Sequence, residues 1–360
     1  MTHLEACKER LRQAGADALI VSSKVGQRYL SDFNYDDGYI LVTPDKSYLL
    51  TDFRYIEAAN AHVNSAEFEV LAPKGGMLAE IASRLRTNNA KTVLFEEEEM
   101  TYGLYETFRD ALPGCNLQKG GSALLVSLRL YKDEEEIARI RKAQAITDET
   151  FSYILTFIKP EMTELEVALE MEFHMRSLGS EGVAFDTIAV SGTNSSRPHG
   201  VPRNVRLEKG FFTMDFGARF DGYDSDMTRT VVLGKADTEM KKLYQTVRNA
   251  QTAAIEALHV GINCRQADRI ARDLIDGAGY AGCFGHGLGH GVGMYIHESP
   301  RFSPAAPADQ VLEVGHVVTV EPGIYLAGKY GCRIEDMIYV HADGTVEDLT
   351  HSPKDLVELF

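Results

Sequence analysis

Cysteine is scarce in this chain, and no stretch of it stays apolar for long. The five cysteines are odd in number and scattered, with no Cys-x-x-Cys pair: Cys7, Cys115, Cys264, Cys283 and Cys332. This pattern argues against a disulfide-dense scaffold and predicts a reduced, cytoplasmic protein. No run approaches the ~18 apolar residues of a membrane span, so no membrane contact is expected. The charged start, Met1–Arg10, also lacks the apolar core of a signal peptide.

Basic residues and several catalytic motifs are missing too. The chain has 37 Lys and Arg against 53 Asp and Glu, which gives a formal net charge of -16. Nucleic acid is therefore not expected as a partner, because phosphate binding needs a basic face. No Gly-x-Ser-x-Gly occurs, which argues against a serine hydrolase. Gly285–Gly293 does not satisfy the Gly-x-Gly-x-x-Gly pattern of a dinucleotide loop.

What is present indicates two domains. With 360 residues, 44% hydrophobic and 25% charged, the chain is long for a single core. Residues 1–122 alternate helical patterns with short apolar strand patterns, which predicts an α/β unit. Gly120-Gly121-Ser122 is interpreted as a joint, and Asp133–Glu136 as the acidic first turn of a helix. We therefore expect one domain over residues 1–125 and a second over 126–360.

Asp215 and Asp226 flank a predicted β-hairpin. Apolar and β-branched residues surround a turn at Phe220-Asp221-Gly222. With a two- or four-residue loop, the numbers of cross-strand partners add to an odd sum, and 215 plus 226 gives 441. Both carboxylates then share one face, directly opposite or on a neighbouring diagonal, within ~8 Å. Such a pair is either two solvated acids or a site for a divalent cation.

A segment rich in glycine and histidine follows at Gly285–Glu298. Five glycines in the nine residues Gly285–Gly293 argue against a helix and let the backbone approach another group closely. His290 is interpreted either as a polar loop residue or as a metal ligand through its neutral imidazole.

Two further acids interrupt apolar strand patterns. Val317–Val320 runs into Glu321, and Glu335-Asp336 lies inside a second apolar run, so a second hairpin is expected. A buried acid needs a partner. Either Arg333 pairs with one of the adjacent acids while the other points outward, or Glu321 and Glu335 are metal ligands.

Four carboxylates and one imidazole form the candidate ligand set: Asp215, Asp226, His290, Glu321 and Glu335. Their motifs resemble those of the metal-dependent pita-bread peptidases, which include methionine aminopeptidase, aminopeptidase P and prolidase. The matching segments, spread over about 133–360, are Asp215 with Asp226–Thr230, His286–His290, Val320–Gly323 and Arg333–Asp336. Arg28–Leu30 and Leu50–Tyr55 resemble the creatinase-type domain of the Xaa-Pro members. The resemblance implies an α/β (α+β) fold with a creatinase-like N-terminal α/β domain followed by a pita-bread catalytic domain.

The same resemblance implies a metallo-exopeptidase that cleaves the Xaa-Pro bond at the N-terminus of dipeptides or short peptides. It implies two divalent ions per chain, Mn²⁺ first, with Co²⁺ and Zn²⁺ as alternatives. Asp226 and Glu335 would bridge the ions, Asp215 would complete one shell, and His290 with Glu321 would complete the other. A hydroxide shared by the ions would attack the scissile carbonyl while Glu321 relays its proton. A homodimer is expected because relatives are usually dimers.

Further residues take substrate roles from the resemblance. His297 matches a donor to the developing oxyanion, and His199 matches a histidine that lines the site and contacts substrate. Arg301 matches an arginine that contacts the proline carboxylate in prolidase-like relatives, and Arg333 is a second candidate for that contact. Carboxylate binding favours a dipeptidase, and its absence would admit longer peptides, as in aminopeptidase P. A creatinase-like C–N hydrolase or a catalytically silent binding protein on the same fold is the alternative.

Overall fold

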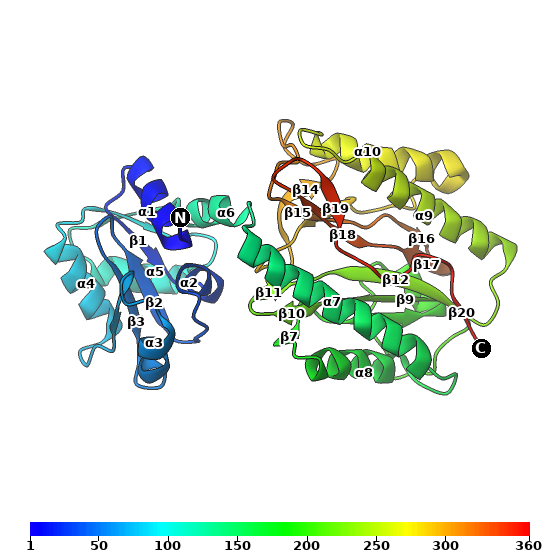
Figure 1. Ribbon diagram of the computed structural model, residues 1–360, viewed down its shortest axis with the longest axis horizontal. Coiled ribbons are helices and arrows are strands. Elements are labelled where there is room, and N and C mark those ends of the chain that lie inside the picture. Colours follow the sequence, from blue (N-terminus) through cyan, green and yellow to red (C-terminus); the bar gives the residue numbers. More distant parts are fainter. The chain divides into compact units, whose positions relative to one another are not determined.

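The computed structural model describes every residue, Met1–Phe360, and divides into two compact units, Met1–Arg129 and Leu130–Phe360 (Figure 1). The expected boundary after residue 125 lies inside a helix, Gly121–Arg129. The interpretation of Gly120–Ser122 as a joint was wrong, because Gly121 begins that helix. A Cβ on Gly121 would overlap the carbonyl oxygen of Phe95, so this glycine permits close packing against a strand.

The first unit is built around one six-stranded sheet with the order β4-β3-β2-β1-β5-β6. Its elements are α1 (His3–Gln13), β1 (Ala18–Val21), α2 (Lys24–Ser31), β2 (Gly38–Val42), β3 (Ser47–Thr51), α3 (Ile56–His62), β4 (Phe68–Leu71), α4 (Met77–Thr87), β5 (Thr92–Phe95), α5 (Tyr102–Ala111), β6 (Asn116–Gln118) and α6 (Gly121–Arg129). All of β1 is buried, as expected for an apolar strand covered on both faces. The predicted α/β unit is confirmed.

The second unit contains four small sheets and two helix pairs. Its first half consists of α7 (Glu134–Phe157), α8 (Glu164–Ser177), β7 (Gly182–Val183), β8 (Ile188–Ser191), the 3₁₀ turn η1 (Gly192–Ser196), β9 (Gly210–Phe216), β10 (Ala218–Phe220), β11 (Tyr223–Asp224) and β12 (Met227–Leu233). Its second half consists of α9 (Thr238–Ala257), α10 (Cys264–Ile275), the π-helical turn η2 (Asp276–Tyr280), β13 (Gly289–Gly291), β14 (Glu298–Phe302), β15 (Val317–Val320), β16 (Gly323–Leu326), β17 (Tyr330–Arg333), β18 (Asp336–Val340), β19 (Val346–Asp348) and β20 (Glu358–Leu359).

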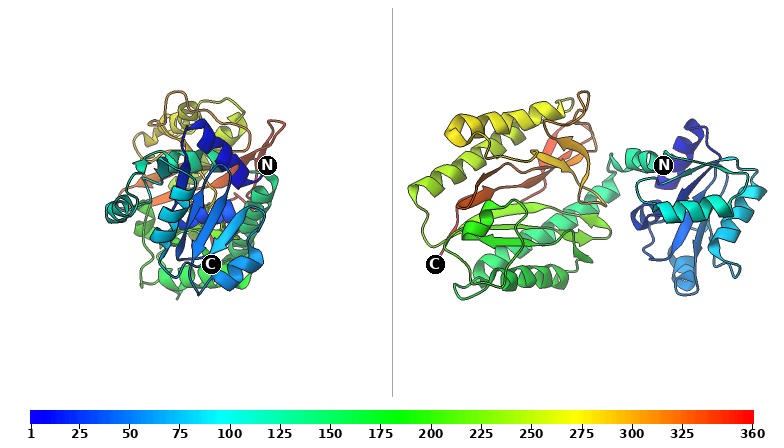
Figure 2. Two further views of the ribbon diagram at one scale, coloured as in Figure 1. Left: turned by 90° about the vertical axis from the view of Figure 1, so that its left-hand side faces the viewer. Right: turned by 180° about the vertical axis from the view of Figure 1, so that it is seen from behind.

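The two halves follow one plan, in which two helices are succeeded by a long hairpin. Figures 1 and 2 show the sheets lying between the pair α7–α8 and the pair α9–α10. The first pair packs its apolar face on β8, β9 and β12, and the second packs on β14, β15 and β18. The Asp133 side chain accepts the backbone N–H of Glu136, and the Glu136 side chain accepts the backbone N–H of Asp133, which forms a capping box at the start of α7. The predicted acidic helix start is confirmed. None of the helices combines the length and the apolar character that crossing a membrane would require.

The first long hairpin pairs β9 with β12 and places Asp215 opposite Thr228. The same register continues into the tip β10–β11, where Asp221 and Gly222 turn the chain with φ of 48° and 83°. Asp226 precedes β12 and therefore lies on the diagonal from Asp215. The predicted hairpin, its turn and the shared face of the two aspartates are confirmed.

The second long hairpin pairs β15 with β18 and continues into the tip β16–β17. Val320 lies opposite Asp336 in β18, and Gly323 lies opposite Arg333 in the tip. Glu321 and Glu335 therefore occupy the interruption between strand pair and tip. The predicted second hairpin is confirmed, and Asp226, Glu321 and Glu335 lie where the regular pairing breaks, while Asp215 lies within the β9–β12 pairing next to the break.

Gly217, at the interruption of the first hairpin, gives a test of this construction. A Cβ there would overlap the carbonyl oxygen of Ser225, so Gly217→Ala should destabilise the protein by about 3 kcal/mol. Thermal unfolding followed by circular dichroism measures the loss. In Gly103→Ala, the control in α5, the new Cβ meets nothing within 4 Å and should add about 0.5 kcal/mol. A wild-type melting temperature for Gly217→Ala would contradict the close approach.

Candidate metal centre

The predicted ligands converge on one cavity of the second unit. Asp215 lies in β9 and His290 in β13, while Asp226, Glu321 and Glu335 lie directly beside the ends of β12, β15 and β18. The four other predicted site residues line the same cavity, which has a volume of about 530 Å³: His199, His297, Arg301 and Arg333. All nine residues that the sequence analysis selected as site candidates therefore line this one cavity.

The centre of the site is formed by Asp226, His290 and Glu335, whose ligand atoms lie within 4.8 Å of one another and are buried. The Nε2 atom of His290 lies 3.6 Å from Asp226 Oδ2 and 3.4 Å from Glu321 Oε1. Its Nδ1 atom lies 3.0 Å from the carbonyl oxygen of Gly291. That carbonyl places the ring proton on Nδ1, so the lone pair of Nε2 faces the carboxylates, as metal ligation requires.

Asp215 supplies a separate indication of a cation. Its Oδ2 atom accepts a hydrogen bond from Arg333 Nη2, while its buried Oδ1 atom has no partner. Buried carboxylate oxygens are almost always satisfied by a donor or an ion. A divalent cation of the Mn²⁺, Co²⁺ or Zn²⁺ type fits this oxygen-rich set with its single imidazole.

The pKa shifts within the cluster also indicate a bound cation. Burial and then the neighbouring carboxylates raise the pKa of Asp226 and of Glu335 well above the ordinary range. Burial is also the main cause that raises the pKa of Glu321 to about 8. Burial lowers the pKa of His290 to about 3, which keeps its imidazole neutral. A bound cation would favour the ionised carboxylates and would not compete with an imidazolium.

Two threonine hydroxyls orient the acids. Thr228 donates its hydroxyl proton to Glu335 Oε2 at 2.7 Å. The Thr319 hydroxyl accepts from the backbone N–H of His290 at 3.1 Å and donates to Glu321 Oε1 at 3.4 Å. Sequence reasoning missed both residues. Their positions carried a usable signal, because Thr228 is two residues after Asp226 and Thr319 two before Glu321, on the same strand face.

Arg333 lies beneath the carboxylates, where it is buried and fully engaged. Its Nε donates to the Thr228 hydroxyl at 2.9 Å, and its Nη1 donates to the Tyr325 hydroxyl at 2.6 Å and to the Pro198 carbonyl at 3.2 Å. Its Nη2 pairs with Asp215. These contacts favour a role in holding Asp215 over the predicted contact with a substrate carboxylate.

Arg301 differs from Arg333 in its surroundings. It is exposed at the cavity, and only its backbone N–H is engaged, by Gln310 Oε1 at 3.2 Å. Its guanidinium is therefore available to a ligand in the cavity.

Three histidines surround the ligands. His199 and His297 are exposed at the cavity, and the His297 ring meets His290 edge-on with centroids 4.5 Å apart. Burial and then Arg301 lower the pKa of His297. His286 was not assigned a role from the sequence. Its Nε2 lies 2.9 Å from the Tyr325 hydroxyl and its Nδ1 lies 3.9 Å from Glu321 Oε2.

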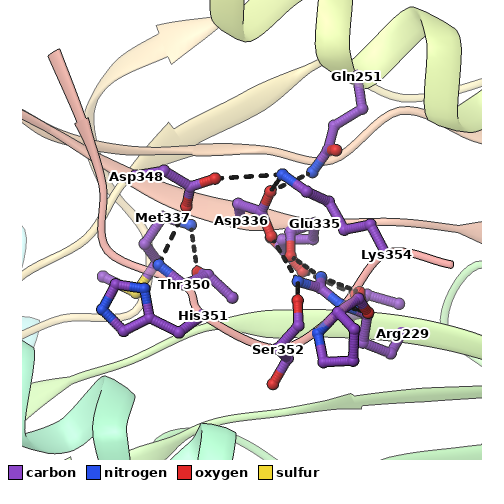
Figure 3. A network of polar contacts seen from close by, with 12 residues as sticks. Arg229, Gln251, Glu335, Asp336, Met337, Asp348, Thr350, His351, Ser352 and Lys354 are labelled. Atoms are coloured by element: carbon purple, nitrogen blue, oxygen red, sulfur yellow. Dashed lines mark hydrogen bonds and ion pairs between the residues drawn. The ribbon is translucent and has the colours of Figure 1, made fainter.

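A buried ion network fixes the back of the site (Figure 3). Arg229 Nη1 donates to the carbonyl oxygens of Glu335 at 2.6 Å and Thr228 at 3.0 Å, which ties the two hairpins together. Arg229 Nη2 donates to Asp336 Oδ1 at 2.7 Å, and Lys354 pairs with the other oxygen of Asp336. The alternative that Arg333 pairs with one of the adjacent acids was wrong, because Asp336 takes Arg229 and Lys354 instead.

Helix α10 fixes the glycine-rich segment. Arg272 donates to the carbonyl oxygens of Phe284 and His286, each at 2.7 Å. Asp268 pairs with Arg272 and accepts the backbone N–H of Leu288 at 3.0 Å. A segment so rich in glycine has little conformational preference of its own, so these bonds set the path that leads to His290.

Comparisons with known proteins agree with this geometry. Residues 138–342 match the model of metallopeptidase family M24, and residues 3–131 match the creatinase/prolidase N-terminal domain. An uncharacterized peptidase of Bacillus subtilis, YqhT, is 40% identical over 99% of both chains. The structure of an Xaa-Pro dipeptidase from Bacillus anthracis aligns with a TM-score of 0.94 and 37% identity over 99% of both chains. An X-Pro aminopeptidase from Thermotoga maritima MSB8 aligns with a TM-score of 0.90 and 34% identity over 97% of this chain and all of the other.

Without metal, the stability of the protein should fall as pH rises from ~6.5 to ~8. In this window Glu321, whose pKa is raised to about 8, keeps most of its proton in the folded protein, while the unfolded chain has lost it; the raised pKa values of Asp226 and Glu335 act in the same direction. Each such proton corresponds to about 1.4 kcal/mol per pH unit. The lowered pKa of His290 opposes this trend only below ~6.5, the pKa of an unfolded histidine.

Melting temperatures measured across this window in chelator test the prediction. Saturating Mn²⁺ is the control, because a cation holds the ligands ionised and should remove the decline. A melting temperature that is constant or rises from pH ~6.5 to ~8 in chelator would contradict the raised carboxyl pKa values.

Proposed function

The chain belongs to metallopeptidase family M24 and carries its creatinase/prolidase N-terminal domain, and on that premise we propose that it hydrolyses Xaa-Pro bonds at peptide N-termini with two divalent cations. The observation that carries the proposal is the convergence of four carboxylates and one neutral imidazole on one cavity, with three of the five buried together and an unpaired oxygen on Asp215. The family match confirms the expected pita-bread fold with a creatinase-type first domain.

The residues present fit a pair of cations. Asp226 and Glu335 would be shared between them, Asp215 would serve one, and His290 with Glu321 would serve the other. Two divalent cations held there would ionise a water molecule as the nucleophile and polarise the scissile carbonyl. Mn²⁺ is the proposed metal, with Co²⁺ and Zn²⁺ as alternatives.

The protein groups around the reacting bond have separable tasks. Glu321 is the proposed acceptor of the proton of the attacking water, and its membership of the ligand cluster supports this role, since its Oε1 atom lies 3.4 Å from His290 Nε2. His297, kept neutral by its lowered pKa, can donate a ring N–H to the oxyanion. His199 lines the same cavity and would contact the substrate there. Arg301 offers a free guanidinium fork to the α-carboxylate of the proline in a dipeptide.

Dipeptides are the proposed main substrates, and short peptides the second. A bond before proline has no amide N–H, so recognition must come from the chain ends and the ring. The accessible guanidinium of Arg301 supports a free carboxylate as one of those ends. The alternative of a metal-free creatinase-like hydrolase or a silent binding protein is disfavoured, because all five ligand positions are filled and face one cavity.

A homodimer in the cytoplasm completes the proposal. All five cysteines are free thiols in the structure, and a reducing compartment maintains that state.

Hydrolysis of Ala-Pro should disappear in chelator and return with Mn²⁺. Asp226→Asn should lower the Mn²⁺-dependent rate by more than ~100-fold, since a ligand matters more than the outer-shell groups that cost 10–100-fold. The variant should keep its circular dichroism spectrum and bind fewer than two ions per chain by elemental analysis. Asp221→Asn, in the turn of the same hairpin, is the matched control and should behave as wild type. A near-normal rate in Asp226→Asn would exclude the shared ligand role.

Arg301→Ala should separate the two substrate classes. Loss of a charge-assisted fork to the free carboxylate should raise KM for Ala-Pro about 10-fold and leave KM for Ala-Pro-Ala within about 2-fold. Arg301→Lys keeps the charge without the fork, so its KM for Ala-Pro should be intermediate. Equal effects on both substrates would remove Arg301 from carboxylate binding. Cleavage of Ala-Pro-Ala alone by the wild type would favour an aminopeptidase.

A further inference from the structure

The connection between β8 and β9 forms one wall of the cavity. Its residues Pro198–Pro202 line the cavity and include His199. Apart from η1, this connection contains no helix or strand. A site residue on such a connection needs anchors elsewhere in the chain if it is to keep one position.

Glu164, the first residue of α8, is such an anchor. Its side chain is fully buried and accepts six hydrogen bonds from the connection and its base. Oε1 accepts from the N–H of Ser191 at 2.8 Å, from its hydroxyl at 2.9 Å and from Arg203 Nη2 at 2.8 Å. Oε2 accepts from Asn194 Nδ2 at 3.1 Å and from the backbone N–H and Nε of Arg203 at 3.0 and 2.9 Å.

The backbone of α8 holds the same connection. The N–H of Glu164 donates to the carbonyl oxygen of Val205 and the N–H of Leu165 to that of Arg203, each at 3.2 Å. These are first-turn N–H groups, which have no partner inside a helix. The beginning of α8 therefore binds the connection through its carboxylate and through its free N–H groups.

The tip of the connection is held from the other side. The carbonyl oxygen of Pro198 accepts from Arg333 Nη1 at 3.2 Å, and the same guanidinium pairs with Asp215. Gly200 makes the tip tight, since a Cβ there would lie 3.0 Å from Val190 Cγ1 and 3.1 Å from Asn194 O. The wall around His199 is thus fixed at its base by Glu164 and at its tip by Arg333, which also binds the candidate ligand Asp215.

A purely stabilising role explains this arrangement poorly. A buried ion pair is often no more stable than apolar residues of the same size. A bidentate Arg–carboxylate pair fixes geometry more strictly than apolar packing does. The segment that leads to His290 is held in a similar way, because Asp268 and Arg272 of α10 bind its backbone.

We propose that Glu164 is a positioning residue, which with Arg203 holds the β8–β9 connection so that His199 faces the ligand cluster. The proposal rests on the function proposed above for this cavity. It makes Glu164 act on the reaction through His199, and it predicts no direct contact between Glu164 and substrate.

Glu164→Gln is the central variant, because it keeps the size of the side chain and replaces one acceptor oxygen by an NH₂ group facing donors. Amide hydrogen exchange across residues 192–208 should accelerate at least about 10-fold, since the connection loses charge-assisted bonds. The kcat/KM for Ala-Pro with Mn²⁺ should fall on the order of 100-fold, as expected when a site group is displaced by about 1 Å. Bound Mn²⁺ per chain should stay at the wild-type value.

Glu166→Gln is the matched control. It makes the same change two residues further along α8. The exposed Glu166 side chain completes the capping box by accepting the backbone N–H of the N-cap residue Thr163, and a glutamine side chain can accept the same bond. Exchange and turnover should match the wild type. If Glu164→Gln does not fold, Arg203→Lys keeps the charge, loses the fork and should show the same pattern in weaker form.

A double-mutant cycle with His199→Ala separates positioning from general stability. If Glu164 acts through His199, then Glu164→Gln should lower kcat/KM by less than about 2-fold once His199 is already alanine. Losses that multiply in the double variant would overturn the proposal, as would wild-type exchange across 192–208 in Glu164→Gln. If the wild type with Mn²⁺ cleaves no Xaa-Pro peptide, the proposed function fails, and the exchange measurement alone decides whether Glu164 holds the wall.

Discussion

The crowding of buried carboxylates is the constraint on which the rest of the second unit depends. Asp226, Glu335 and Glu321 lie in one cluster, and burial raises the pKa of each. Such a cluster is stable only when protons or cations neutralise its charge. At neutral pH a divalent cation stabilises it more than protons do. The surrounding groups keep the acids close in spite of their repulsion, with Thr228 donating to Glu335 and Arg333 pairing with Asp215.

The fold meets this constraint by interrupting two regular hairpins. Continuous pairing would occupy the backbone and pack both faces, whereas the breaks beside Asp226 and at Glu321 leave carboxylates facing a cavity. Irregular backbone is then required around the site, and it has to be held from outside. A buried acid of each flanking helix does so by pairing with an arginine: Glu164 of α8 pairs with Arg203 of the β8–β9 connection, and Asp268 of α10 pairs with Arg272 of the same helix.

The shared face of Asp215 and Asp226 was predictable because strand geometry is local, whereas the full candidate ligand set depended on the family resemblance. An odd sum of residue numbers places Asp215 and Asp226 on one face, and the observed register agrees, with Asp215 opposite Thr228. The partners of these ligands were not predictable. Arg333 reaches Asp215, and Arg229 reaches Glu335, across strands of different sheets, and no spacing rule relates such residues. Gly121 was misread for a similar reason, since its packing against Phe95 is invisible to local composition.

Glu335 and Asp336 show why a cation belongs on only one side of the sheet. Adjacent residues of a strand point to opposite faces. Glu335 faces the ligand cluster, where burial and like charges raise its pKa, while Asp336 faces Arg229 and Lys354, which outweigh burial and lower its pKa. On the back face, the positive charges of Arg229 and Lys354 thus neutralise Asp336 without a metal (Figure 3). Because Arg229 also binds the carbonyl oxygen of Glu335, the charge balance behind the strand fixes the backbone from which the ligand projects.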